Sequence, residues 1–351
     1  MTHRAAEARP GGATPIEPSD EPIFIGGLDR CGKTTMRAFL TSHPRISIPA
    51  VGSNMETYFY RRFGDLSDPG NAERCLRAML RYKHVRYLRP DPERIRREFV
   101  QGPRTYERLF SLFLIHHAER DGKPRWGAQT GLIERYADSV FEAFPRARFV
   151  HMLRDPRDRY EASLAAWPGG RGRAGGATAR WRTTVRLAER NRRRYPDRYV
   201  IVRFEDLVRD TERVIREVCE FLGEAFVPSM LAMPGAPEHR DKLDHDDEGV
   251  RDAVPLSDVY LGAYRGRVAP RELAFIQLHA GRSMRRHGYE TERLGLSGAE
   301  RVRFALTDWP DQAARMVAWW AIEDAHDRFP RRFGREPDAR MIVAEPAEAV
   351  R

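Results

Sequence analysis

The sequence predicts an α/β protein with three layers, in which helices cover both faces of a mostly parallel central sheet. It also predicts helical insertions and a helical C-terminal appendage. A short apolar strand, a polar loop and an amphipathic helix follow one another three times along the 351 residues. Such alternation favours parallel strands with helices on both sides. The composition, 41% hydrophobic and 32% charged, fits a buried core beneath a well-solvated surface.

The first unit begins with an apolar strand at residues 23–25 and continues through a glycine-containing loop. In the following segment Met36, Phe39 and Leu40 recur at helical spacing. The connecting segment, here called the phosphate loop, fits G-x-x-x-x-G-K-[ST] with the residues Gly27-Leu28-Asp29-Arg30-Cys31-Gly32-Lys33-Thr34. A match between a strand and a helix is far more specific than the motif alone. It favours phosphate binding over an ordinary turn with a solvated lysine and predicts a P-loop-like fold.

Each residue type in the phosphate loop suits an anionic ligand. Glycines let the backbone curl so that N–H groups point inward, and the helix N-terminus adds partial positive charge. Full charges would come from Arg30 and Lys33, and hydroxyl hydrogen bonds from Thr34 and Thr35. By itself the loop would serve a kinase, with Mg²⁺ on Thr34, as readily as another transferase.

The second unit is a strand at residues 148–153, followed by a turn and a helix. The strand ends at Arg154, where Asp155 can cap the next helix and Pro156 fits its first turn. On that helix Ser163 shares a face with Tyr160. An arginine at a strand end and a hydroxyl on the adjoining helix can converge on a phosphate. The alternative interpretation is a structural salt bridge beside a buried helix serine.

The third unit is a strand at residues 199–203 with a helix that ends at Gly223. Between the first two units we expect a mostly helical insertion with an apolar stripe that starts at Tyr106. The glycine-rich run at residues 168–177 predicts a mobile loop, which could fold over a ligand. The predicted organisation is a disordered leader at 1–21, a main domain at 22–297 and a helical extension at 298–351.

Composition narrows the function. The net charge of +10 invites an anionic ligand, but arginine is spread along the chain and no nucleic-acid-binding signature is evident. Three cysteines far apart exclude a disulfide framework or zinc cluster and fit a reducing compartment. The hydrophobicity pattern of the sequence predicts neither a signal peptide nor a membrane-spanning helix. We expect a cytoplasmic protein without a metal, of unknown oligomeric state.

The motifs together resemble the PAPS-dependent sulfotransferases, in particular the bacterial branch related to Golgi-type carbohydrate and tyrosylprotein enzymes. PAPS is 3′-phosphoadenosine 5′-phosphosulfate. In that family a loop of the type P-[RK]-S-G-T-T wraps the 5′-phosphosulfate, and a strand ending in R-D-P-R-D with a following serine binds the 3′-phosphate. The matching residues are Arg30, Gly32 and Thr34 in the loop and Arg154-Asp155-Pro156-Arg157-Asp158 at the second turn.

Further matches extend the resemblance over about residues 22–290. They are the Arg203-Phe204-Glu205-Asp206-Leu207 segment and the closing His287-Gly288-Tyr289. The chain departs from the family pattern at Cys31 and Lys33, where serine and threonine are usual. Ser163 lies nine residues after Arg154 rather than eight, and Ala128-Gln129 stands where relatives often have two charged residues.

The resemblance implies a sulfotransferase that moves a sulfuryl group from PAPS to an acceptor hydroxyl without a metal and releases adenosine 3′,5′-bisphosphate (PAP). The implied nucleotide ligands are Arg30, Cys31, Gly32, Lys33, Thr34, Thr35, Arg154 and Ser163. Lys33 would also stabilise charge during transfer, and Glu56 lies where related enzymes often carry the base. A surface glutamate at a helix start is an equal alternative for Glu56, and His43 and His151 are weaker candidates.

Two other functions stay open at this stage. A P-loop small-molecule kinase would need a Mg²⁺-binding carboxylate at a strand end, a place that Asp155 occupies. A catalytically inactive nucleotide-binding protein is suggested by Ala128-Gln129 and the shifted serine. The acceptor, whether carbohydrate, lipid or another small molecule, cannot be deduced from the sequence.

Overall fold

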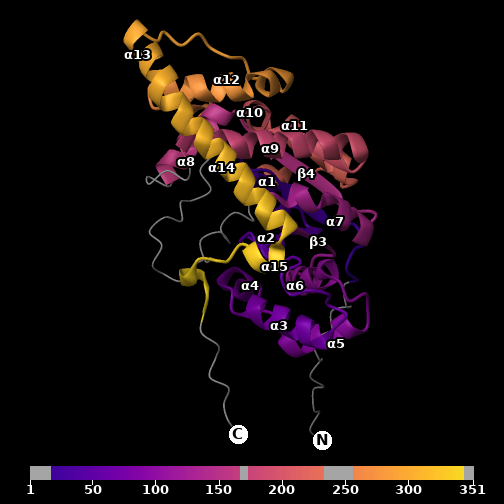
Figure 1. Cartoon of the computed structure of the whole chain (residues 1–351). Helices are drawn as coiled ribbons and strands as arrows, with labels where there is room; N and C mark the ends of the chain where they lie inside the picture. The colour runs from indigo at the N-terminus through magenta and orange to yellow at the C-terminus, as the bar shows by residue number, and fades with distance from the viewer. Residues whose placement is uncertain (1–16, 167–172, 233–255, 344–351) are drawn as a thin grey trace, which may run out of the picture.

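The computed structural model describes residues 17–166, 173–232 and 256–343 (Figure 1). Within these ranges five parallel strands form one sheet in the order β2-β3-β1-β4-β5. The strands are β1 (Ile23–Gly26), β2 (Ile46–Ser47), β3 (Arg125–Gln129), β4 (Arg148–Leu153) and β5 (Tyr199–Arg203). The α/β fold with a parallel sheet is therefore confirmed.

All three strands expected from the sequence are present, and two further strands were not expected. β2 has only two residues, and β3 carries Arg125, Gly127 and Gln129 in place of the β-branched residues that typify strands. β3 is nevertheless buried along its whole length because β1 and β2 pair with it on either side. Pairing with a strand on each side, rather than a composition typical of strands, therefore makes this segment part of the sheet.

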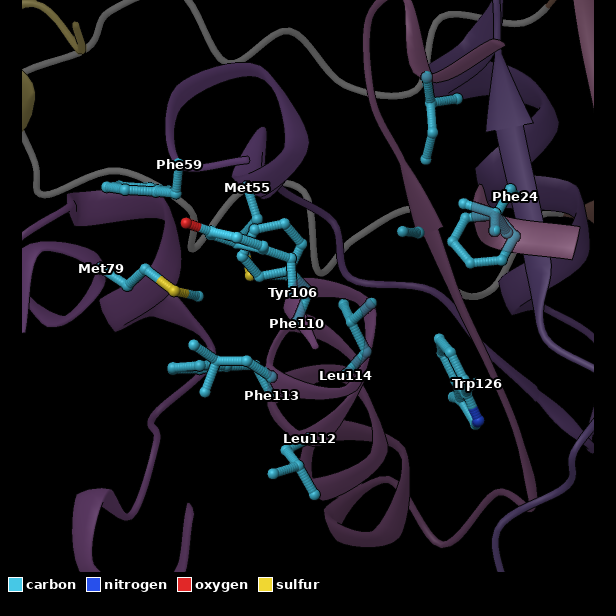
Figure 2. Close-up of a cluster of buried hydrophobic side chains, with 14 of the residues drawn as sticks. Phe24, Met55, Phe59, Met79, Tyr106, Phe110, Leu112, Phe113, Leu114 and Trp126 are labelled. Atoms are coloured by element: carbon cyan, nitrogen blue, oxygen red, sulfur yellow. The ribbon is translucent and has the colours of Figure 1, made fainter. Parts of the chain in front are cut away.

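The insertion between β1 and β4 packs against one face of the sheet. Phe24 on β1 stacks on Phe149 with ring centroids 5.1 Å apart and meets Trp126 edge-on at 6.0 Å. Figure 2 shows Phe24 and Trp126 on one side and Phe59 and Met79 of the insertion on the other, with Tyr106 and Phe110 in between. The helices are α2 (Met55–Tyr58), α3 (Pro69–Leu80), α4 (Lys83–Tyr87), α5 (Pro92–Val100), α6 (Tyr106–Arg120) and α7 (Ala137–Ala143), with the 3-10 turn η1 (Ile133–Tyr136).

The opposite face is covered by helices that follow the strands. Ile23 and Ile25 point into this second core, because alternate residues of a strand face opposite sides. Gly223 ends α11 in the left-handed conformation with φ +73°, as the sequence predicts. The elements are α1 (Lys33–Thr41), α9 (Arg173–Arg194), α10 (Phe204–Arg209), α11 (Thr211–Leu222), η2 (Pro228–Ala232) and α12 (Pro270–Arg286).

The glycine-rich run is partly helical, which corrects the expectation of a loop over residues 168–177. Residues 167–172 lie outside the described part of the chain, but α9 begins at Arg173 and includes Gly175 and Gly176, both buried. A Cβ on Gly175 would overlap the backbone of Gln312 on α14. Two helices approach this closely only where one presents no side chain, and here glycine serves helix packing rather than flexibility.

The C-terminal extension is helical, and its long helix, residues 309–328, packs against α9 (Figure 1). It comprises α13 (Gly298–Arg303), the π-helical segment η5 (Phe304–Asp308), α14 (Trp309–Arg328), α15 (Pro330–Phe333) and η6 (Ala339–Met341). Trp320 donates its indole N–H to Thr183 Oγ1 at 3.3 Å, and the Arg135 guanidinium lies 5.9 Å from the Trp319 ring. Both tryptophans thus join the extension to the main body.

Two short elements complete the described chain, α8 (Pro156–Ala166) after β4 and η4 (Asp258–Tyr260) before α12. Among the described residues, no helix combines the length and the apolar character that crossing a bilayer requires. The predicted domain boundaries at residues 21 and 297 stay predictions.

Candidate active site

The phosphate loop has the curled backbone that an anion site needs. Gly27 and Gly32 adopt φ +107° and +88°, and a Cβ on either would overlap Met152 or Phe204. The chain enters α1 at Gly32 with no side-chain cap, so the first N–H groups of the helix carry no side-chain acceptor. Thr34 is exposed and Thr35 half-buried in this first turn. Uncapped N–H groups beside two hydroxyls suit a phosphate or sulfonate.

The second turn lies against this loop. β1 and β4 are neighbours in the sheet, with Gly26 paired to His151, so both turns leave the same edge. Arg154, directly after β4, donates from Nη1 to the carbonyl oxygen of Arg30 at 3.0 Å and from Nη2 to that of Tyr260 at 2.9 Å. Its buried Nε has no hydrogen-bond partner in the described structure. One side chain thus joins the two turns and keeps a donor unused.

The acidic residues of the R-D-P-R-D motif build this turn. Asp155 accepts from the backbone N–H of Arg157 at 2.8 Å and pairs with its guanidinium at 2.7 Å. Asp158 accepts the N–H groups of Gly262 at 2.8 Å and Tyr264 at 3.1 Å. Both carboxylates are buried and engaged in scaffolding. Asp155 is therefore poorly placed to bind the Mg²⁺ of a kinase.

The other two family-like segments meet beneath the turn. Glu205 accepts the backbone N–H of Asp155 at 2.8 Å and the phenol of Tyr289 at 2.9 Å. Burial raises the pKa of Glu205. The two distant segments that carry Glu205 and Tyr289 thus support the Arg154 turn rather than line it.

Arg159 is a candidate residue that the sequence analysis missed. It lies on α8, is 3% exposed and donates from Nε to the carbonyl oxygen of Asp29 at 3.2 Å. Ser163 donates its hydroxyl to the carbonyl oxygen of Arg159 at 2.8 Å, one helical turn on. Because residues four apart share a helix face, the choice of Ser163 could have pointed to Arg159 as well.

Three cations gather around Cys31. This thiol is 1% exposed, and burial raises its pKa to about 11 against the opposing charges of Arg159, Arg154 and Lys33. Cys31 is therefore a neutral packing residue at ordinary pH. Lys33 Nζ lies 3.7 Å from Asp29 Oδ1. The positive charges of the loop and of α8 converge at the edge of the sheet where the uncapped helix begins.

Glu56 lies in a separate environment on α2. The residue is 6% exposed, and its Oε2 has no hydrogen-bond partner in the described structure. Burial, with a smaller contribution from the Glu107 carboxylate, raises the pKa of Glu56 to about 7. A carboxylate with that pKa is suited to accept a proton near neutral pH.

Glu56 lines a cavity of about 260 Å³, here called the Glu56 cavity. Its lining comes from three segments far apart in the sequence, which are residues 56–62, 132–139 and 326–335. At Gly131, next to this wall, a Cβ would lie 3.5 Å from Lys33 Nζ. Leu132, the residue that follows Gly131, lines the cavity, so this part of the wall adjoins the segment that packs beside Lys33.

The turn η1 links the cavity to the loop. Glu134, fully buried, accepts the N–H of Gly27 at 3.3 Å and also contacts the Thr184 hydroxyl. Its neighbours Arg135 and Tyr136 line the Glu56 cavity. We found no signal for Glu134 in the sequence, because its partners come from segments that only folding brings together.

The C-terminal wall of the cavity is held by ion pairs. Arg135 pairs with Glu323 at 2.6 Å and with Asp327 at 3.0 Å. Arg62 donates to the carbonyl oxygen of Arg335 at 2.8 Å. These contacts join the insertion and η1 to the extension, so all three segments form one cavity.

The remaining sequence candidates have structural partners. His43 contacts the carbonyl oxygen of Ala225 at 3.0 Å, and His151 bonds Tyr199 at 2.9 Å inside the sheet. Gln129 donates to the carbonyl oxygen of Ala50 at 3.1 Å, and Ala128 is buried within β3. The described residues contain no cluster of three or more His, Cys, Asp or Glu side chains placed to hold a metal.

The fold and the phosphate loop define a P-loop-like α/β protein with an uncapped helix start and a cluster of basic side chains at the edge of its sheet. The chain belongs to the sulfotransferase family, whose model matches residues 22–228. It is thus a sulfotransferase enzyme, with the acceptor not specified. No curated protein sequence matches the chain.

Two solved structures share the fold. The sulfotransferase domain of the Synechococcus PCC 7002 olefin synthase is 20% identical with a TM-score of 0.55, and the alignment covers 79% of this chain and 97% of that one. The sulfotransferase domain from the curacin biosynthetic pathway is 15% identical with a TM-score of 0.51, covering 79% and 100%.

Proposed function

We propose that this chain transfers a sulfuryl group from PAPS to the hydroxyl of a small acceptor held in the Glu56 cavity. The observation that supports this most is the contact between Arg154 and the carbonyl oxygen of Arg30, 3.0 Å long, which joins the two phosphate-binding turns at one sheet edge. A nucleotide with phosphates at both its 3′ and 5′ positions needs two adjacent anion sites. ATP needs only one.

The residues present fit such a donor. The uncapped start of α1 with Arg30, Cys31, Gly32, Lys33, Thr34 and Thr35 would hold the 5′-phosphosulfate. Arg154, whose Nε is an unused buried donor, would take the 3′-phosphate, and Ser163 would contribute less because its hydroxyl already donates to the carbonyl oxygen of Arg159. Arg159 would add charge beneath the loop.

In transfer, the acceptor oxygen forms a bond to sulfur as the bond between sulfur and the 5′-phosphate oxygen breaks, and PAP leaves. PAPS supplies the activated sulfuryl group. Lys33 stabilises the negative charge that develops on the departing phosphate oxygen, and Glu56 receives the proton of the acceptor hydroxyl. Two observations support this pairing: Glu56 lines the cavity, and Leu132 of the cavity wall directly follows Gly131, which lies beside Lys33.

Calorimetry with PAP, AMP and ATP–Mg²⁺ tests the nucleotide assignment. We expect PAP to bind without metal and more tightly than AMP, because only PAP carries the 3′-phosphate. Arg154→Ala should weaken PAP binding about 10- to 100-fold, as for the loss of one hydrogen bond to a charged group. It should weaken AMP binding less, through the lost contact with the carbonyl oxygen of Arg30 in the phosphate loop. Arg148→Ala is the matched control, since Arg148 begins the same strand.

A preference for ATP–Mg²⁺ over PAP would contradict the proposal and restore the kinase alternative. Transfer itself is measured with radiolabelled PAPS and a panel of phenols, sugars and alcohols.

The cytoplasmic location stays a prediction from the sequence.

A further inference from the structure

The Glu56 cavity is lined by several arginines, and most of them are neutralised by acids of the same chain. Arg62 pairs with Glu336 at 3.0 Å. Arg135 and Arg335 both pair with Glu323. The two aspartates of the lining are also engaged, since Asp327 pairs with Arg135 at 3.0 Å and Asp138 with Arg190 at 3.1 Å. These charges hold the wall together.

Arg61 differs from the other arginines of the wall. It is exposed, and no ion pair or hydrogen bond involves its side chain within the described ranges. Its guanidinium carbon lies 5.1 Å from the centroid of the Tyr60 ring. The Tyr60 ring is itself fixed between Tyr136 at 4.9 Å and Tyr106 at 5.4 Å. An aromatic support thus orients this guanidinium at the cavity and leaves its N–H groups for another partner.

The backbone at Arg61 adds an independent observation. Its φ of +58° is left-handed, a region that non-glycine residues rarely adopt. Unusual backbone of this kind gathers at ligand sites, where the surrounding structure holds it in place. Here Arg62, the next residue, is tied to the carbonyl oxygens of Tyr58 at 3.2 Å and Arg335 at 2.8 Å. The hydrogen bonds of Arg62 therefore fix the backbone beside Arg61, which lines the cavity.

We propose that the acceptor carries an anionic group, such as a carboxylate, in addition to its reacting hydroxyl, and that Arg61 binds this group. The inference rests on the proposed function and names its acceptor class. A cavity of about 260 Å³ lies just below the range of ~300–1,000 Å³ that is common for drug-sized ligands, so the acceptor is small. The tyrosine rings and the arginine together fit a compact hydroxylated acid.

Matched pairs of probes test this class by binding alone. The full chain is saturated with PAP and titrated calorimetrically with 4-hydroxybenzoate against 4-hydroxybenzamide, and with galacturonate against galactose. We expect the acid of at least one pair to bind about tenfold more tightly than its neutral partner, as for a hydrogen bond to a charged group. Raising the salt concentration should reduce this preference because the site is exposed.

Arg61→Gln should abolish the preference for the acid while PAP affinity stays unchanged. Arg89→Gln is the matched control, because Arg89 is also exposed, has φ +43° and does not line the Glu56 cavity. Equal binding of acid and neutral probes, no binding of either pair, or a preference that survives Arg61→Gln would overturn the inference. If the wild-type chain did not bind PAP, that result would contradict the proposed function itself. Failure of the inference and failure of the proposed function are therefore distinguishable.

Discussion

The phosphate side and the Glu56 cavity lie next to each other but are built in different ways. The phosphate side comes from two short stretches, residues 26–35 and 154–163, each of which joins a strand to a helix. The cavity takes its lining from segments near residues 60, 135 and 330. The C-terminal part of this lining falls outside residues 22–228, which match the family model. Under the proposed function, donor binding would depend mainly on local sequence and acceptor choice on the tertiary structure.

Lys33→Met should have the largest effect, on the phosphate side. We expect kcat to fall about 100- to 1,000-fold, the loss typical of removing one positioned donor of charge stabilisation. Folding should change little, because Lys33 pairs with Asp29, which is largely exposed, at a long 3.7 Å. Single-turnover rates with radiolabelled PAPS measure the loss of activity, and Lys83→Met on α4 is the control. A loss below tenfold with PAP binding intact would remove Lys33 from catalysis.

Glu56→Gln should lower kcat about 100-fold without changing PAP affinity, because it removes a general base. In the wild type the rate should rise with pH through about 7, where Glu56 loses its proton, and the variant should not show this rise. Glu142→Gln, an exposed glutamate on α7, is the control. An unchanged pH profile would show that another group accepts the proton.

The same variant should be more stable than the wild type at pH 8. The folded-state pKa of about 7 lies above the usual value, so the folded protein holds this proton more tightly and loses stability as pH rises from about 4.5 to 7. The full cost of the ionised group is about 3 kcal/mol at most. Thermal unfolding should show a gap at pH 8 that closes toward pH 5. If the wild type and the variant had equal unfolding midpoints at pH 5 and also at pH 8, that result would contradict the buried position of Glu56.

Arg335→Ala tests the C-terminal wall and should have a smaller, more selective effect. We expect the KM for the acceptor to rise about fivefold, since loosening one wall weakens binding without removing a reacting group. PAP affinity should not change, because Arg335 lies in the extension. Arg340→Ala, whose side chain is 91% exposed, is the control. A change in PAP affinity instead would show that the two regions are not separable.

Ser163→Ala should have the smallest effect. Its hydroxyl proton already goes to the carbonyl oxygen of Arg159 at 2.8 Å, so a phosphate gains little from it. We expect PAP affinity to fall less than about threefold, well below the cost of losing a charged contact. Ala162→Ser, which restores the spacing of the family, should strengthen PAP binding. A loss above tenfold in Ser163→Ala would show that the hydroxyl turns toward the nucleotide.

The sequence predicted the phosphate side in detail because its pattern is local. Three strands, the caps at Asp155 and Gly223 and the two strand-to-helix turns all follow from residues that are near neighbours in the chain. Arg159 escaped notice although it lies one helical turn from Ser163. Gly175 was misread as part of a loop because its reason for being glycine, the approach of Gln312, lies on another helix.

By itself, then, the sequence determined the strand, the glycine turn and the helix start that together predict a phosphate site within about ten residues. Only the tertiary structure decided that Arg154 contacts the phosphate loop, that Glu134 holds Gly27, and that the extension closes the Glu56 cavity. The reason is physical. Side chains hundreds of residues apart share no periodic pattern, and only packing places Arg61 and Arg335 on one wall.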